Sequence, residues 1–161
     1  MMAAFSFEIA NAELEFEQGK LLFKEYAATL DFDLGYQGFD SELATIATQY
    51  KAPSGALLVC YDQQKTAVGC AGIRKFSEDV AELKRLYVQP AFRGFKLGRK
   101  LLELSIQTAA DLHYNFIRLD TVPSQRKAQD LYRYLGFYEI ESYRYSPIDG
   151  TMFFEKKLRG A

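Results

Sequence analysis

Six basic residues and no acid lie between residues 84 and 100, around a glycine-containing turn. The turn follows Pro90, carries Gly94 and Gly98, and precedes a helical pattern that starts near Leu97. A helix N-terminus offers unbonded main-chain N–H groups and the positive end of the helix dipole, and glycine lets a ligand approach the main chain closely. These features predict a cradle for a pyrophosphate group. The alternative is that the basic residues form an ordinary solvated surface.

The turn matches neither the phosphate-binding loop G-x-x-x-x-G-K-[ST] nor the dinucleotide pattern G-x-G-x-x-G. The hexapeptide RGFKLG at residues 93–98 follows a strand that ends in VQP, and it resembles the [RQ]-x-x-G-x-[GA] motif of the GNAT acetyltransferases. Lys96 stands where that family has its central glycine. The segment AQDLYRYLGF at 128–137 is similar to the family's A-x-x-L-Y-x-x-x-G-F element, with Gln125 where asparagine is frequent. The resemblance covers residues 57–158.

This resemblance implies that acetyl-coenzyme A is the co-substrate. Its pyrophosphate is expected to lie on the main chain of residues 93–98, and its pantetheine arm to pair with the end of the preceding strand as an added strand would. Lys96 either adds charge to the phosphate site or indicates a turn shaped differently from the family's. The expected coenzyme-binding residues are Leu86, Tyr87, Val88, Arg93, Gly94, Phe95, Lys96, Leu97, Gly98, Arg99, Gln125 and Ala128.

Acetyl transfer from a thioester to an amine requires a neutral amine, a stabilised oxyanion and a proton for the departing thiolate. By correspondence with the family, Glu82 is the candidate general base and Tyr132 the candidate acid, with the N–H of Leu86 at the oxyanion. We expect burial in the strand to raise the pKa of Glu82. Each side chain has a structural alternative. Glu82 could pair with Lys84 on the same strand face, and Tyr132 could be an ordinary packed tyrosine.

The net charge is only −1, but the first 50 residues carry nine acids and two bases. The resemblance implies that the acceptor, a small-molecule or peptide amine, binds to this N-terminal part. Because the part is acidic, we expect the acceptor to be cationic. Phe32, Tyr36 and Phe39, together with Glu82, are the expected substrate-binding residues. The acids expected near the mouth of the pocket are Asp31, Asp33, Asp40 and Glu42. The alternative is an ordinary acidic helical surface.

The length of 161 residues and the order of elements predict one α/β domain with a mixed sheet and helices on both faces. The resemblance specifies a GNAT-like, mostly antiparallel sheet of about seven strands, with residues 1–55 on the acceptor side and 56–161 forming the coenzyme-binding core. Strands are expected at 5–9, 56–61, 66–76, 80–88, 116–121, 137–145 and 151–158, and helices at 11–29, 40–50, 97–112 and 125–135. Asn11 is the expected cap of the first helix.

Several classes of protein are disfavoured by what the sequence lacks. It has no apolar run of membrane-spanning length and no basic segment typical of a signal peptide, so we expect a cytoplasmic protein without a membrane partner. Cys60 and Cys70 lack metal-site spacing and are expected to be reduced core residues, and no metal is expected. His113 is expected to cap a helix end. A local basic segment at a pI of about 5.9, without a nucleic-acid motif, disfavours nucleic-acid binding.

Two functions follow from these patterns. The first is direct acetyl transfer from acetyl-coenzyme A to a primary amine. The second is a non-catalytic acyl-coenzyme A-binding or sensor module. It is considered because Lys96 and Gln125 depart from the motifs of the family. The many aromatic residues of the last two strands could line a pocket or a homodimer surface, although core packing explains most of them.

Overall fold

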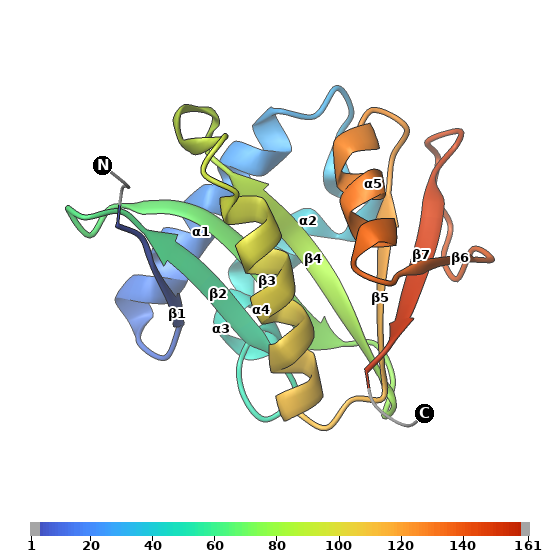
Figure 1. The fold of residues 1–161 in the computed structure, drawn as a ribbon, viewed down its shortest axis with the longest axis horizontal. Coiled ribbons are helices and arrows are strands. Elements are labelled where there is room, and N and C mark those ends of the chain that lie inside the picture. The colour runs from blue at the N-terminus through green and yellow to red at the C-terminus, as the bar shows by residue number, and fades with distance from the viewer. Residues whose placement is uncertain (1–3, 159–161) are drawn as a thin grey trace.

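The computed structural model describes residues 4–158, which form one seven-stranded sheet with helices on both faces (Figure 1). The strands are β1 Ser6–Ile9, β2 Ala56–Tyr61, β3 Ala67–Lys75, β4 Val80–Val88, β5 Phe116–Thr121, β6 Tyr138–Ile140 and β7 Met152–Lys157. The helices are α1 Glu13–Ala28, α2 Phe39–Ala44, α3 Ile46–Gln49, α4 Leu97–Asp111 and α5 Arg126–Tyr134, with 3-10 helices η1 Leu34–Gln37 and η2 Pro90–Phe92. The mixed α/β fold predicted from the sequence is confirmed.

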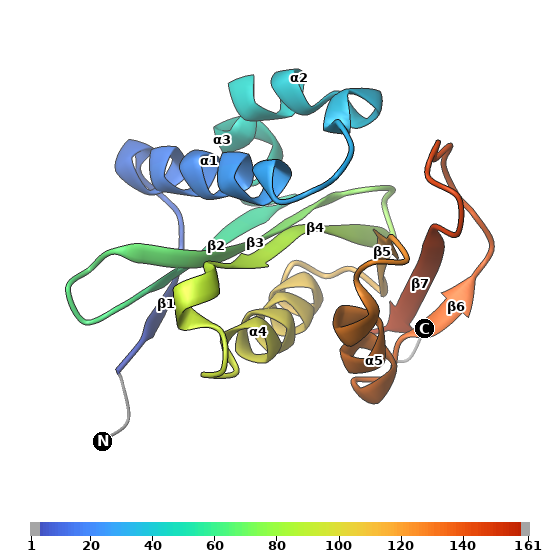
Figure 2. The ribbon, with the colours of Figure 1, turned by 90° about the horizontal axis from the view of Figure 1, so that it is seen from above.

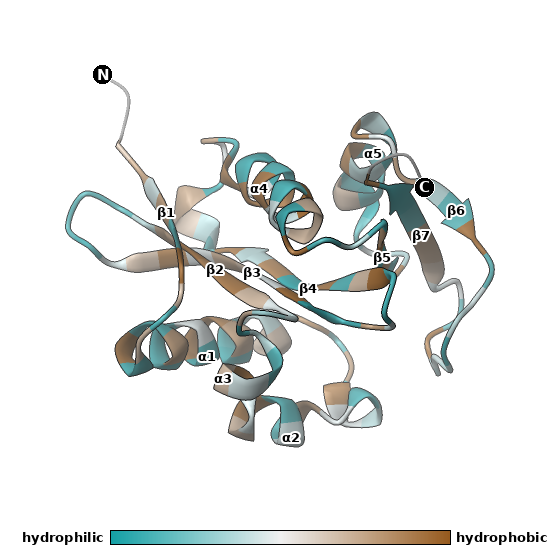
Figure 3. Ribbon diagram, turned by 90° about the horizontal axis from the view of Figure 1, so that it is seen from below, coloured by the Kyte–Doolittle hydropathy of each residue, from teal (hydrophilic) through white to brown (hydrophobic). Residues whose placement is uncertain are grey.

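The sheet has the order β1-β2-β3-β4-β5-β7-β6, and β4–β5 is its one parallel pair within the described residues. Figure 2 shows α1, α2 and α3 over one face and α4 and α5 over the other. Both faces of the centre are therefore covered, and β2 is buried along its whole length and mostly hydrophobic (Figure 3).

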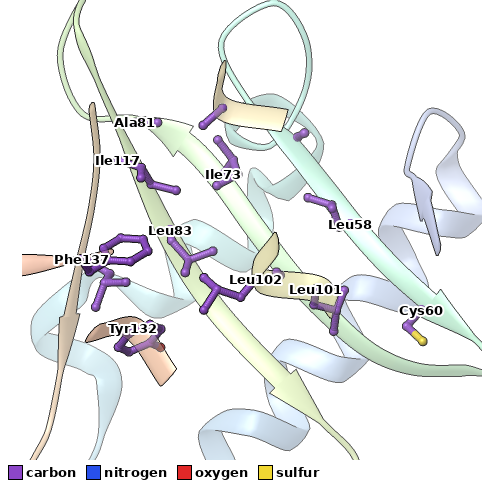
Figure 4. Packing of buried hydrophobic residues seen from close by; sticks show 14 of the residues in the cluster. Leu58, Cys60, Ile73, Ala81, Leu83, Leu101, Leu102, Ile117, Tyr132 and Phe137 are labelled. Carbon is purple, nitrogen blue, oxygen red and sulfur yellow. The ribbon is translucent and has the colours of Figure 1, made fainter. Parts of the chain in front are cut away.

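Alternate residues of β2 point into two separate apolar clusters, as the period of a strand requires. Leu58 and Cys60 join the larger cluster under α4, together with Leu101 and Leu102 (Figure 4). Leu57, Val59 and Tyr61 join the smaller cluster, which packs residues of α1 and α3 against the opposite face. The two clusters fix the helical layers on either side of β3 and β4.

Three local predictions were wrong. Glu15, not Asn11, caps α1, because its carboxylate accepts the N–H groups of Asn11 and Ala12 at 2.7 and 3.1 Å. The helix expected over 40–50 is two helices separated at Thr45, whose hydroxyl donates to the Ser41 carbonyl at 2.8 Å. The strand expected over 137–145 ends at Ile140.

No helix among residues 4–158 is long and apolar enough to cross a membrane. Met1–Ala3, which belong to the segment that was not predicted to be a signal peptide, lie outside the described residues. The predicted cytoplasmic location and the homodimer remain predictions.

Strands β4 and β5 pair only where they begin. Val80, Ala81 and Glu82 lie opposite Phe116, Ile117 and Arg118, and no later residue of β4 pairs with β5. Farther along, the register of β4 against β3 shifts between Cys70 and Gly72, and Arg85 adopts a φ of 60°. Such a bulge increases the local twist of a strand and redirects it. The two strands therefore diverge (Figure 1).

A buried ion pair holds the bulge. The guanidinium of Arg85 donates from Nη2 to Glu42 Oε1 at 2.6 Å and from Nε to Oε2 at 3.1 Å. The Tyr50 hydroxyl also donates to Glu42 at 2.9 Å, and the Phe39 ring lies 5.2 Å from the guanidinium carbon. Burial by itself would raise the pKa of Glu42, but its bonds to Arg85 lower that pKa below its ordinary value. The pair therefore joins α2 to the bulge of β4.

Substitution of Glu42 by glutamine is expected to lower the free energy of unfolding by about 3 kcal/mol, because it leaves the buried Arg85 charge without its partner. Urea denaturation followed by circular dichroism measures the loss. The double variant Glu42→Met/Arg85→Met removes both charges and is expected to recover most of it. The control, Glu17→Gln at an exposed site on α1, should leave stability unchanged. Equal stability of Glu42→Gln and this control would contradict the prediction.

Candidate active site

A cleft of about 90 Å³ opens where β4 and β5 diverge. Residues 83–86 of β4 form one wall, and residues 119–122 at the end of β5 form the other. Ala128 and Tyr132 of α5 close one end, and Phe32 and Tyr36 belong to the opposite, N-terminal side. A volume several times the roughly 15 Å³ needed for one water suits a small polar group.

The edge of β4 along this cleft is free. Because β5 pairs with β4 only as far as Glu82, the main chain of residues 83–88 has β3 on one side and no strand on the other within residues 4–158. An unpaired strand edge presents N–H and C=O groups that can bond an extended ligand. The predicted position for a pantetheine arm therefore has the required free main chain.

The turn after β4 has a left-handed residue at the position of the family's glycine. Lys96 has φ 60° and ψ 28° and is the N-cap of α4, while Gly94 has φ 99°. The left-handed conformation costs a residue with a side chain about 1 kcal/mol relative to glycine. The Lys96 side chain is exposed beside the turn, and its contribution to a phosphate site remains a prediction.

Three N–H groups at the start of α4 lack intrahelical partners, because the first bond of the helix runs from Lys100 N to Lys96 O at 3.1 Å. Lys96 and Lys100 are exposed and form no ion pair with residues 4–158. Arg93 Nε donates to the Val88 carbonyl at 3.2 Å, which fixes the turn to the end of β4. The residues around the turn therefore suit an anion.

Tyr132 lies on α5 with its ring against Phe137 and Phe154, at centroid distances of 5.7 and 6.2 Å (Figure 4). It lines the cleft, and no group among residues 4–158 hydrogen-bonds its hydroxyl. Burial raises the pKa of Tyr132, so the hydroxyl keeps its proton at neutral pH. An unpartnered, protonated hydroxyl in a cleft is able to donate.

Gln125 joins three elements at the same end of the cleft. Its side-chain oxygen accepts from the Thr121 hydroxyl at 2.9 Å and from Val122 N at 3.3 Å. Its amide nitrogen donates to the Tyr26 hydroxyl at 3.0 Å. Gln125 thus connects β5, α5 and α1, and it lines the cleft together with Ala128.

Glu82 is 1% exposed and lies outside the cleft lining. Its carboxylate accepts hydrogen bonds from Arg74 at 3.1 Å, Arg144 at 2.6 Å and the Tyr143 hydroxyl at 3.0 Å. The alternative in which Glu82 pairs with Lys84 is not found, and the ion-pair partners of Glu82 within residues 4–158 are Arg74 and Arg144.

The expected rise in the pKa of Glu82 was also wrong. Burial by itself would raise this pKa, but the charges of Lys84, Arg144 and Arg74 outweigh burial and lower it below its ordinary value. Its catalytic role remains a prediction.

Two charged groups in the cleft were not predicted to act together. Lys84 is 3% exposed, donates to Gln37 Oε1 at 2.8 Å and lies 3.9 Å from Asp120 Oδ1 on β5. Burial lowers the pKa of Lys84 to about 8, against the opposing charges of Glu82 and Asp120. In the sequence, Asp120 alternates with Arg118 along a strand, which is the ordinary pattern of a solvent-facing edge, so no signal identified it.

The acceptor-side residues are divided by the structure. Phe32 and Tyr36 line the cleft with ring centroids 6.4 Å apart, whereas Phe39 lies outside it, against Arg85. Glu42, expected near the mouth of the pocket, is instead the buried partner of Arg85. The other three acids expected there, Asp31, Asp33 and Asp40, do not line the cleft.

The cysteines and the histidine lie away from the cleft. Cys60 and Cys70 are buried free thiols, as predicted, and burial raises the pKa of Cys60 to about 11. His113 follows α4 with φ 73°, and its main-chain N–H donates to Ala110 O at 3.0 Å. Among residues 4–158 no three His, Cys, Asp or Glu side chains gather as metal ligands. The absence of a metal remains a prediction.

Comparison with known proteins identifies the family. The model of the acetyltransferase (GNAT) family matches residues 21–137. An uncharacterised N-acetyltransferase of Schizosaccharomyces pombe is 34% identical over 161 residues, which cover 98% of this chain and 99% of the relative. The chain therefore belongs to the GNAT family and is an acetyltransferase.

Solved structures share its fold. A GNAT acetyltransferase of Staphylococcus aureus has a TM-score of 0.77 at 22% identity, covering 97% of this chain and 100% of that chain. A GNAT acetyltransferase of Elizabethkingia anophelis, solved with acetyl-CoA bound, has a TM-score of 0.66 at 17% identity, covering 96% and 98%.

Glu82→Gln is expected to lower the free energy of unfolding at pH 7 by about 3 kcal/mol, because it leaves two arginines without their buried counter-charge. The pKa of Glu82 in the folded state lies below its ordinary value of 4.5. Its contribution is therefore fully present above pH 4.5 and is lost as pH falls through the lowered value, so the difference between wild type and variant should shrink there. Denaturation at several pH values measures this.

The control is Glu78→Gln, which removes an exposed carboxylate paired with Lys75. Its stability should equal that of the wild type throughout. A constant Glu82→Gln deficit from neutral to acidic pH would show that the charge of Glu82 is not the cause.

Proposed function

We propose that this protein transfers an acetyl group directly from acetyl-coenzyme A to a primary amine. The observation that carries the proposal is the arrangement of three features along β4. Its free edge borders the cleft, its end leads into the anion-suited turn of α4, and the partnerless hydroxyl of Tyr132 lies in the same cleft. This arrangement supports thioester binding between the two diverging strands.

The coenzyme is proposed to lie along this path from the turn to the cleft. Main-chain N–H groups at residues 93–98 would hold the pyrophosphate, with Lys96 and Lys100 supplying charge. The edge at Leu86 to Val88 would pair with the pantetheine arm, and Gln125 and Ala128 would face its far end. The acetyl-CoA bound by the Elizabethkingia acetyltransferase, whose fold is similar, supports this proposal.

The reaction would proceed without an acetyl-enzyme. The neutral amine nitrogen attacks the thioester carbonyl, and the N–H of Leu86 stabilises the oxyanion. The C–S bond then breaks as the nitrogen loses its proton to solvent water. Tyr132 would protonate the departing sulfur. Direct transfer is favoured because neither Cys60 nor Cys70 lines the cleft, and burial raises the pKa of both thiols.

General-base action by Glu82 is the proposal that the family resemblance supplies. The three donors on its carboxylate and its lowered pKa favour a positioning role instead. In that role Glu82 fixes Tyr143 and Arg144 of the segment between β6 and β7, and its negative charge favours the protonated form of Lys84.

The N-terminal part, residues 1–55, is proposed to hold the acceptor, with Phe32 and Tyr36 at the cleft and Phe39 supporting Arg85. A cationic acceptor, expected from the acidic N-terminal residues, has less support. Glu42 is neutralised by Arg85, and Asp31, Asp33 and Asp40 do not line the cleft.

Thiol release from acetyl-coenzyme A in the presence of a panel of amines tests the function, with the acetylated product identified by mass spectrometry. Tyr132→Phe is expected to lower kcat about 100-fold without changing coenzyme affinity, since it removes only the proton donor. Tyr145→Phe, at an exposed tyrosine outside the cleft, is the matched control. Tight coenzyme binding without thiol release from any amine would indicate a binding module instead.

Gly98→Glu tests the coenzyme site apart from stability. A Cβ at Gly98 would lie 4.0 Å from Val88 Cγ2, and glutamate favours a helix over glycine. The variant should be at least as stable as the wild type, because a negative charge in the first turn also suits the helix dipole. It should bind acetyl-coenzyme A about tenfold more weakly, because its carboxylate repels the pyrophosphate. Calorimetry measures both, with Gln107→Glu on the same helix as control. Unchanged affinity would place the pyrophosphate elsewhere.

A further inference from the structure

We propose that the acceptor is a zwitterion, a primary amine with a carboxylate close to its amino group, such as an α-amino acid, held between Asp120 and Lys84. This inference rests on the proposed acetyl transfer and specifies the substrate class of the same site. Asp120 would bind the ammonium group and Lys84 the carboxylate, and the ammonium would lose a proton to solvent water before the nitrogen attacks the thioester.

Charge in the cleft is limited to three side chains of its lining, those of Lys84, Arg85 and Asp120. Arg85 is already neutralised, because Glu42 accepts two hydrogen bonds from its guanidinium. The cation Lys84 and the anion Asp120 are left, and they lie on β4 and β5, the two strands that diverge to form the cleft. The charge available to a ligand is therefore balanced, whereas the N-terminal sequence is acidic.

Both groups have hydrogen-bonding capacity that the protein does not use. No residue within 4–158 donates a hydrogen bond to the carboxylate of Asp120, and its ion-pair partner Lys84 Nζ is 3.9 Å away, too far for a hydrogen bond. Lys84 has three donors, of which one is given to Gln37. Lys84 is buried and the Asp120 side chain is 13% exposed, and charges so far removed from water are normally hydrogen-bonded. A ligand with its own ammonium and carboxylate would supply what both lack.

The positions of the two groups restrict the ligand further. Lys84 and Asp120 are neighbours, so the ammonium and carboxylate that bind them must also be neighbours, as in an α-amino acid and not in a long-chain ω-amino acid. Tyr132 lines the same cleft as Lys84 and Asp120, so an amine held there would share that cleft with the proposed proton donor. The rings of Phe32 and Tyr36 line the same cleft and would contact the side chain of the ligand.

A ligand that carries only positive charge fits less well. Such a ligand would pair with Asp120, but it would also approach the positive charge of Lys84. The charges around Lys84 are the positive Arg85 and Arg144 and the negative Glu82 and Asp120. Burial disfavours the charged form of Lys84, and an incoming carboxylate would restore it. A ligand without a carboxylate would leave the buried ammonium group of Lys84 without this added partner.

The test compares amino acids with their decarboxylated amines. L-alanine, L-leucine, L-methionine and L-phenylalanine, each beside its amine, are titrated by calorimetry into protein saturated with coenzyme A, and thiol release from acetyl-coenzyme A is measured separately. At least one amino acid should bind tenfold or more tightly than its amine. Lys84→Met should abolish that preference and Asp120→Asn should weaken both members of the pair, while Lys51→Met at an exposed site should change neither.

Amines that bind as well as their amino acids, or failure of every amino acid to bind, would overturn the zwitterion inference. Binding of amino acids in preference to their amines, without thiol release, would instead support a zwitterion-binding site between Asp120 and Lys84 and count against the proposed acetyl transfer. Thermal denaturation checks that the variants fold. If Lys84→Met does not, the paired comparison in the wild-type protein decides the question alone.

Discussion

The buried ion pair between Arg85 and Glu42 is the interaction on which the cleft depends. Arg85 occupies a left-handed position within a strand, a conformation that costs a residue with a side chain about 1 kcal/mol or more. The two hydrogen bonds to Glu42 and the contact with Phe39 hold it there. The resulting bulge turns β4 away from β5 and leaves an unpaired edge beside a cavity. A regular parallel pair would have satisfied the same main-chain groups and closed the site.

Three buried charges follow one another on β4, and each is paired with a different part of the chain. Glu82 bonds Arg144 between β6 and β7, Lys84 bonds Gln37 of η1 and faces β5, and Arg85 bonds α2. Buried ion pairs contribute little net stability, since desolvation offsets their attraction, but breaking one is costly. Their effect here is geometric, because they fix the elements around the cleft against one strand.

The regular elements were predictable because their signals are local. Periodicity identified β2, β3, β4 and α4, and two motifs indicated the family. The errors occur where distant contacts decide. β6 ends early where the chain turns to place Tyr143 and Arg144 on Glu82, which lies 61 residues from Tyr143 in sequence. The sign of the pKa shift at Glu82 depends on the same contacts, which no pattern within β4 reveals.

Acceptor chemistry illustrates why charge counted along a sequence differs from charge in a site. The acids of residues 31–42 are numerous, yet Asp33 caps η1 and Glu42 neutralises Arg85, and neither lines the cleft. Asp120 is a single acid in an ordinary strand, but the divergence of β5 from β4 leaves it open to the cleft and short of donors. In the proposed zwitterion site, substrate preference would therefore depend on which charges remain unpaired after the strands separate.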